Sequence, residues 1–159
     1  MKKSIGLAAL LATVLCSYAL AADKEAGHGH VVVLPDKVEF KPNPALPAGA
    51  KSAVLVGDPT KAGPYVLRVK LSDGFKVPPH WHPDAENVTV IQGTFLIGTG
   101  DKFDETKLKT VPVGGFMHMP KEMRHFATVK GETILQVHGI GPFEINYVNP
   151  GDDPRKGKK

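Results

Sequence analysis

The sequence has a single cysteine among its 159 residues, Cys16, and it lies in an N-terminal stretch that we expect to be removed on export. The mature chain would then have no disulfide bond and no thiolate ligand, so a metal site in it must use histidine and carboxylate side chains. The sequence also lacks a glycine-rich phosphate-binding loop, a serine nucleophile elbow and, without Cys16, a cysteine nucleophile. These absences leave metal chemistry as the main route to function.

The N-terminal stretch has the features of a cleaved signal peptide, which we place at residues 1–21. Lys2 and Lys3 precede an apolar run over 5–15, and Ala19-Leu20-Ala21 gives the small-x-small pattern of a processing site. The alternative, a membrane anchor, is disfavoured because the apolar run is too short to cross a bilayer. We therefore expect a periplasmic or extracellular protein with no membrane contact after cleavage.

The formal net charge is low once the predicted signal peptide is removed. Removing Lys2 and Lys3 lowers Lys plus Arg from 20 to 18 against 16 Asp plus Glu, a formal charge of +2. A nucleic-acid partner is not expected at that charge. Much of the excess lies near the C-terminus, and we predict a disordered basic tail over residues 149–159.

The rest of the chain reads as a single all-β domain over residues 36–148, after a flexible segment at 22–35. The 17 Gly and 14 Pro separate short apolar or alternating runs, and no long helical period is present. Residues 102–108 could form one helical turn capped by Asp101, although a polar loop is the plainer interpretation. Strands are expected at 30–34, 37–40, 53–57, 65–71, 87–92, 94–98, 115–119, 125–129, 133–138 and 143–148.

Three potential metal ligands lie close together in the middle of the chain, and strand alternation and a turn are expected to bring them to one site. His80 and His82 share one face of an extended strand, because successive side chains alternate, and Trp81 then points away. Pro83 cannot continue a central strand, so residues 83–85 are expected to turn. Glu86 opens the returning strand and can bring its carboxylate beside the two imidazoles.

The fourth ligand that we predict is His125, about forty residues further on. Gly114, Gly115 and Pro120 bracket a short strand before it. Three imidazole nitrogens and one carboxylate form a donor set that suits first-row divalent metals. A polar cluster without a metal is the alternative, and the combination of spacing, turn and distant histidine favours the metal.

These two stretches resemble the conserved motifs of the cupin superfamily. The first motif, glycine, five residues, His-x-His, three residues, Glu, six residues, glycine, matches at every defined position from Gly74 to Gly93. The second matches at Gly114, Pro120 and His125 and departs at Glu122 and Val129, where the pattern has a glycine and an asparagine. The resemblance implies a cupin double-stranded β-helix, or jelly-roll barrel, of antiparallel strands. It also implies one divalent transition-metal ion (Fe, Mn, Ni, Cu or Zn) held by His80, His82, Glu86 and His125.

The resemblance further implies a function at the metal. Cupins with this ligand set include dioxygenases and oxidases, so a metal-dependent oxidoreductase acting on a small oxygen-rich substrate is the leading hypothesis. A non-catalytic module that binds a small ligand through the ion is the second hypothesis, and an extracytoplasmic metal-handling protein is the third. Cupins often pair through their sheets, which makes a homodimer an expectation as well.

Several further residues have both a functional and a plain interpretation. His118 and His138 are candidates for general bases or for hydrogen-bond partners of the ligands, although ordinary histidines are the simpler interpretation. The thioethers of Met117, Met119 and Met123 could bind cuprous copper, while core packing explains them more simply. The pair His28 and His30 could bind metal loosely or belong to a frayed terminus.

Overall fold

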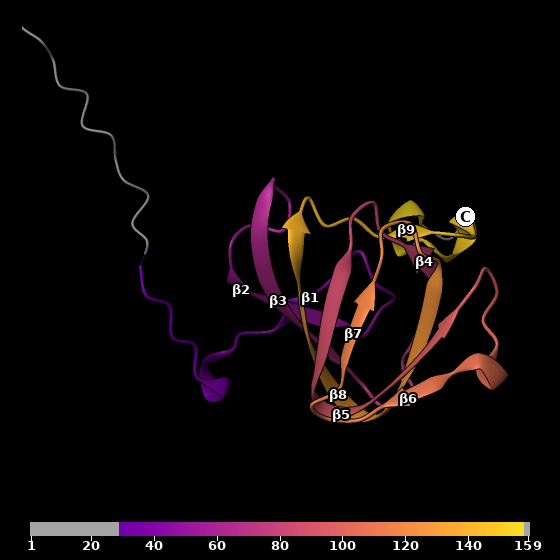
Figure 1. The fold of residues 1–159 in the computed structure, drawn as a ribbon, viewed down its shortest axis with the longest axis horizontal. Coiled ribbons are helices and arrows are strands. Elements are labelled where there is room, and N and C mark those ends of the chain that lie inside the picture. Colours follow the sequence, from indigo (N-terminus) through magenta and orange to yellow (C-terminus); the bar gives the residue numbers. More distant parts are fainter. Residues whose placement is uncertain (1–28, 158–159) are drawn as a thin grey trace, which may run out of the picture. The chain divides into compact units, whose positions relative to one another are not determined.

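The structure, a computed structural model of the chain, describes residues 29–157, so the predicted signal peptide and His28 lie outside the described residues. The body formed by residues 31–157 is built almost entirely from strands, joined by loops and four short 3-10 helices (Figure 1). None of its helices is long and apolar enough to span a membrane. The strands are β1 (Lys41–Pro42), β2 (Lys51–Val56), β3 (Gly63–Leu71), β4 (Lys76–Trp81), β5 (Glu86–Thr99), β6 (Lys109–Val111), β7 (Phe116–Met119), β8 (His125–Gly141) and β9 (Asn146–Tyr147).

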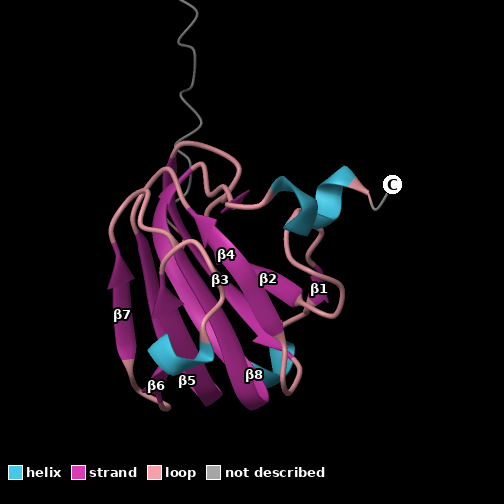
Figure 2. Cartoon of the chain, turned by 90° about the vertical axis from the view of Figure 1, so that its right-hand side faces the viewer, coloured by secondary structure: helices cyan, strands magenta, loops and turns pink. Residues whose placement is uncertain are grey.

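All strand pairs are antiparallel, and the sheet curls into a jelly-roll half-barrel (Figure 2). The order β1-β2-β3-β8-β4-β9 forms one path, and β5 pairs with β6, β7 and β8. The first part of β8, from His125 to Lys130, lies between β4 and the second half of β5. Its later part, from Thr133 to Gly141, lies between β3 and the first half of β5. The all-β, antiparallel prediction is therefore confirmed.

The bend that lets β5 serve both halves of the barrel lies at Gly93. Its φ is +75°, in the left-handed region that favours glycine, and the pairing with β8 shifts register on either side of Gln92. A Cβ at Gly93 would come within 2.6 Å of the Glu132 main-chain oxygen. The last glycine of the first motif is thus required by the close crossing of β5 and β8.

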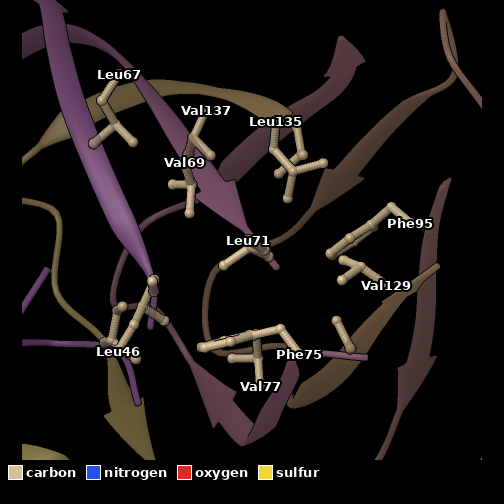
Figure 3. Close-up of a cluster of buried hydrophobic side chains, with 14 of the residues drawn as sticks. Leu46, Leu67, Val69, Leu71, Phe75, Val77, Phe95, Val129, Leu135 and Val137 are labelled. Carbon is tan, nitrogen blue, oxygen red and sulfur yellow. The ribbon is translucent and has the colours of Figure 1, made fainter. Parts of the chain in front are cut away.

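The core lies inside the curl and is formed by alternate residues of the strands. In β3, the side chains of Tyr65, Leu67, Val69 and Leu71 are buried, while the intervening residues are more exposed. Figure 3 shows how side chains from several strands point toward one interior. The start of β5 shows the same alternation, because Val88 and Val90 are buried and Ile91 is exposed.

The ends of the domain differ from the expected strand pattern. No strand forms at 30–34 or 37–40; Pro35 instead opens the 3-10 helix η1 (Pro35–Lys37), because proline has no amide proton for a strand pairing. The polar loop contains η2 (Glu105–Lys107), capped by Asp104 and not by Asp101. Within the expected tail, η3 (Pro150–Asp152) and η4 (Pro154–Lys156) form, and Arg155 Nη2 donates a hydrogen bond to Ile145 O at 2.7 Å.

Candidate metal centre

The structure brings together the four side chains that the sequence analysis selected as metal ligands. His80 lies near the end of β4 and is paired directly with His125, the first residue of β8. His82 lies one residue beyond the end of β4, and Glu86 opens β5 after a bend at 83–84. The expected turn therefore returns the carboxylate to the histidines, and all four side chains are buried.

The ligand atoms of the histidines converge on one point. One ring nitrogen from each of His80, His82 and His125 lies within 4.8 Å of the others. Glu86 Oε2 lies 3.4 Å from His82 Nε2 and 3.6 Å from His125 Nε2. The three imidazoles thus form the compact part of the cluster, and the carboxylate approaches it from the side of His82 and His125.

Each histidine is oriented by a main-chain carbonyl. The Nδ1 atoms of His80, His82 and His125 lie 2.8, 2.6 and 2.9 Å from the carbonyl oxygens of Pro78, Glu144 and Met123. A carbonyl only accepts hydrogen bonds, so each Nδ1 carries the proton and, in the neutral ring, Nε2 presents a lone pair. The Nε2 of His82 is buried and has no hydrogen-bond partner among the described residues. This is the arrangement of metal-ligating histidines.

The electrostatics of the cluster favour a bound cation. Burial, together with the neighbouring His125 and His82 rings, lowers the pKa of His80 to about 3. Burial also disfavours a charge on His82, but the Glu86 carboxylate outweighs it and the pKa of His82 is raised. Burial would raise the pKa of Glu86, yet His82 and His125 hold that pKa well below its ordinary value. The ionised carboxylate therefore attracts to His82 a proton that a metal ion could replace.

The comparisons with known proteins agree with this fold. A family model described as "Domain of unknown function (DUF4437)" matches residues 32–153. The chain belongs to the DUF4437 family. The search of curated proteins finds no match for this DUF4437 protein.

Solved structures of the same fold are numerous, and the predicted cupin fold is confirmed. The polyketide cyclase RemF from Streptomyces resistomycificus is 17% identical with a TM-score of 0.63, over 80% of this chain and 92% of that one. An RmlC-like cupin from Shewanella frigidimarina is 17% identical with a TM-score of 0.55, over 72% and 92%. A Methylibium petroleiphilum protein assigned as an acetylacetone dioxygenase is 19% identical with a TM-score of 0.59, over 79% and 85%. At these identities, the likeness establishes the fold.

A small cavity extends from the cluster into the barrel of the DUF4437 protein. Its volume is about 60 Å³, and aliphatic and aromatic side chains such as Val69, Phe95 and Leu135 form most of its wall. Phe143 stacks on the His82 ring, with centroids 4.8 Å apart and planes at 21°. A cavity of this size holds a few waters or a very small molecule. The four buried side chains of the cluster therefore form the polar part of the wall of a mostly apolar chamber.

The structure places His118 and His138 away from this chamber. Both are paired with Asn87, whose side chain points to the outer face because its neighbours Glu86 and Val88 point inward. His118 is exposed, and its Nδ1 lies 2.9 Å from Asn87 Oδ1. Strand alternation thus directs both side chains away from the cluster.

The loop of the second motif departs from the family pattern in sequence and not in backbone conformation. Glu122 takes the place of the usual glycine, yet its φ is +62°, in the left-handed region. Its N–H donates to His82 O at 2.7 Å, and Met123 in the same loop supplies the carbonyl that orients His125. The loop therefore keeps the conformation that glycine would favour, and it supports two of the predicted ligands.

Sequence reasoning missed other residues of the site. Asn43 and Leu46, from the loop before β2, line the chamber together with Phe143. The Glu144 carbonyl that orients His82 is 62 residues away in the chain. No sequence spacing links these residues to the motifs. By contrast, Pro78 and Met123 each lie two residues before the histidine that they orient, a local relation that the sequence could have suggested.

Proposed function

We propose that this protein binds one divalent transition-metal ion through the Nε2 atoms of His80, His82 and His125 and the carboxylate of Glu86. The main support is the buried Nε2 of His82, which has no hydrogen-bond partner among the described residues and lies 3.4 Å from a carboxylate oxygen. A cluster of lone pairs around one point is unfavourable without a cation. Three imidazoles and a carboxylate suit Fe, Mn, Ni, Cu or Zn.

We further propose that the protein, with the ion bound, would catalyse an oxidation of the dioxygenase or oxidase type, with dioxygen as the oxidant, on a small oxygen-bearing substrate. When bound, a redox-active ion supplies Lewis acidity and one-electron chemistry. The chain's own residues would position and enclose the substrate: the carbonyl-oriented imidazoles hold the ligand geometry, and the apolar wall limits water. A likeness to a protein assigned as an acetylacetone dioxygenase fits this reaction class, as an analogy of fold.

The composition of the chamber wall supports chemistry at the ion. Its only titratable lining residues, in the part of the chain that the structure describes, are the four proposed ligands. No separate general acid or base lines the chamber, so a mechanism that needs one beside the ion is less well supported. The same observation favours the second candidate function, a non-catalytic module that holds a small ligand at the metal.

We propose that either activity takes place after export, on the basis of the predicted N-terminal signal peptide.

The proposal is tested by elemental analysis of the mature protein beside His82→Ala. About one equivalent of metal in the wild type and its loss in the variant are expected, since His82 is a ligand with no substitute. Oxygen uptake with small acids then separates the oxidoreductase from the binding module. A redox metal with substrate-dependent uptake supports catalysis, whereas full metal occupancy in His82→Ala would contradict the ligand assignment.

A further inference from the structure

The loop before β2 closes one side of the chamber and is tied to the same wall as His80. Tyr147 OH donates to Ala45 O at 2.8 Å, and Tyr147 is paired with His80 across β9 and β4. The loop is closed internally by Asn43 N–H donating to Ala50 O at 3.1 Å. Asn43 and Leu46 line the chamber on the inside and a surface groove on the outside. This loop is thus the partition between the chamber and solvent.

Asn43 contributes the one polar side chain among the described lining residues that is not part of the metal cluster. Its Oδ1 accepts a hydrogen bond from Ala45 N–H at 3.0 Å, which identifies that atom as the oxygen of the amide. The Nδ2 group is then left to donate. A donor in an otherwise apolar wall suits a ligand with an acceptor atom, because such groups fix orientation in small-molecule sites.

The charge and size of the chamber restrict the ligand further. A divalent ion beside the Glu86 carboxylate carries one net positive charge, and no Lys or Arg is among the described lining residues. A single negative charge on the ligand would neutralise the site. An apolar cavity of about 150 Å³ accepts benzene, so the chamber's 60 Å³ corresponds to roughly two to three non-hydrogen atoms. Formate has this size and charge, and acetate exceeds it by one methyl group.

We propose that Asn43 is a ligand-orienting residue, whose Nδ2 donates to a small carboxylate monoanion held beside the metal cluster. This inference rests on the proposed metal site. The carboxylate has two oxygens, so one can face the cluster while the other accepts from Asn43. The residue lies outside both cupin motifs, and its role follows from its place in the chamber wall.

The experiment titrates sodium formate into the Co(II)-loaded protein and follows the visible spectrum of the metal. Asn43→Asp is the informative variant, because its carboxylate still accepts from Ala45 N–H while the donor is lost and a repelling charge is added. We expect its Kd for formate to rise about 10–100-fold. Asn43→Ala, which loses the donor without adding charge, should give a smaller rise and serves if the Asp variant fails to fold.

Asn87→Asp is the matched control, since Asn87 points to the outer face and does not line the chamber. Its Kd for formate should stay within about twofold of the wild type. Unchanged formate binding in folded Asn43→Asp and Asn43→Ala would overturn the role of Asn43 and leave the metal site standing. A wild-type spectrum that formate does not change would overturn the ligand class. Failure to take up Co(II) would refute the metal site itself, and this inference with it.

Discussion

Within the barrel that the structure describes, two groups of histidines differ in the face of the sheet on which they lie. His80, His82 and His125 point into the barrel, and the Nδ1 of each is held by a main-chain carbonyl. His118 and His138 lie on the outer face on either side of Asn87. Buried rings with fixed tautomers and converging lone pairs are prepared for a metal, whereas the outer rings do not converge on one point. The environment of each histidine therefore determines whether it can act as a metal ligand.

The strongest test of this comparison replaces one histidine from each group. His82→Ala should weaken metal binding by roughly 100-fold or more, because it removes a ligand from a buried site. His118→Ala, on the outer face, should leave metal affinity unchanged. Competition titrations with a chelator of known affinity measure both. Equal losses in the two variants would show that the distinction between the inner and outer groups is mistaken.

The pH dependence of metal affinity sharpens the same comparison. In the metal-free protein the pKa of His82 is raised, so His82 keeps a proton at higher pH than an ordinary histidine does. Metal must displace this proton, and affinity should therefore rise about tenfold per pH unit until the pH passes the raised pKa, then level off. Zinc titrations between pH 6 and about 8.5 would show this slope, and His118→Ala should retain it. An affinity that does not vary with pH would contradict the proposed exchange of proton for metal.

Much of the inner group could be predicted from sequence, because strand alternation and turn chemistry act locally. The shared face of His80 and His82 and the turn before Glu86 follow from a period of two and from Pro83. The structure confirms that placement and brings His125 opposite His80. The sequence alone does not show to which face of the sheet the His118 and His138 side chains point. For His118 the reason is that it lies in a four-residue strand whose register is set only by its pairing with β5.

What sequence could not give is the part of the site that comes from distant loops. Asn43, Phe143 and the Glu144 carbonyl reach the chamber through tertiary packing, and nothing in their spacing links them to the motifs. The strands predicted at 30–34 and 37–40 were wrong for a different reason. Short apolar runs such as 30–34 resemble strands, but a strand forms only where a neighbour is available to pair with it.

A smaller effect is expected at the aromatic neighbours of the two groups. Tyr147 is buried beside His80, with ring centroids 6.1 Å apart, and exposed Phe116 lies at a similar 6.4 Å from His138. Tyr147→Phe removes the hydrogen bond to Ala45 O and should lower the free energy of unfolding by about 1 kcal/mol. Phe116→Leu should change it by less than about 0.5 kcal/mol. Urea denaturation of both variants measures the difference. Equal effects would show that the burial of Tyr147 does not make its contribution to stability larger than that of exposed Phe116.

The smallest expected effect concerns the loop that supports the inner group. Glu122 holds a left-handed backbone, φ +62°, which costs a non-glycine residue roughly 1 kcal/mol. Glu122→Gly relieves this strain and keeps the N–H that donates to His82 O, so unfolding free energy should rise by about 0.5 kcal/mol after the added entropy of the unfolded chain is counted. Glu122→Ala removes the same charge but keeps the strain, and it should give no gain. If urea denaturation showed equal stabilisation of both variants, the charge of Glu122 and not its backbone conformation would be the cause.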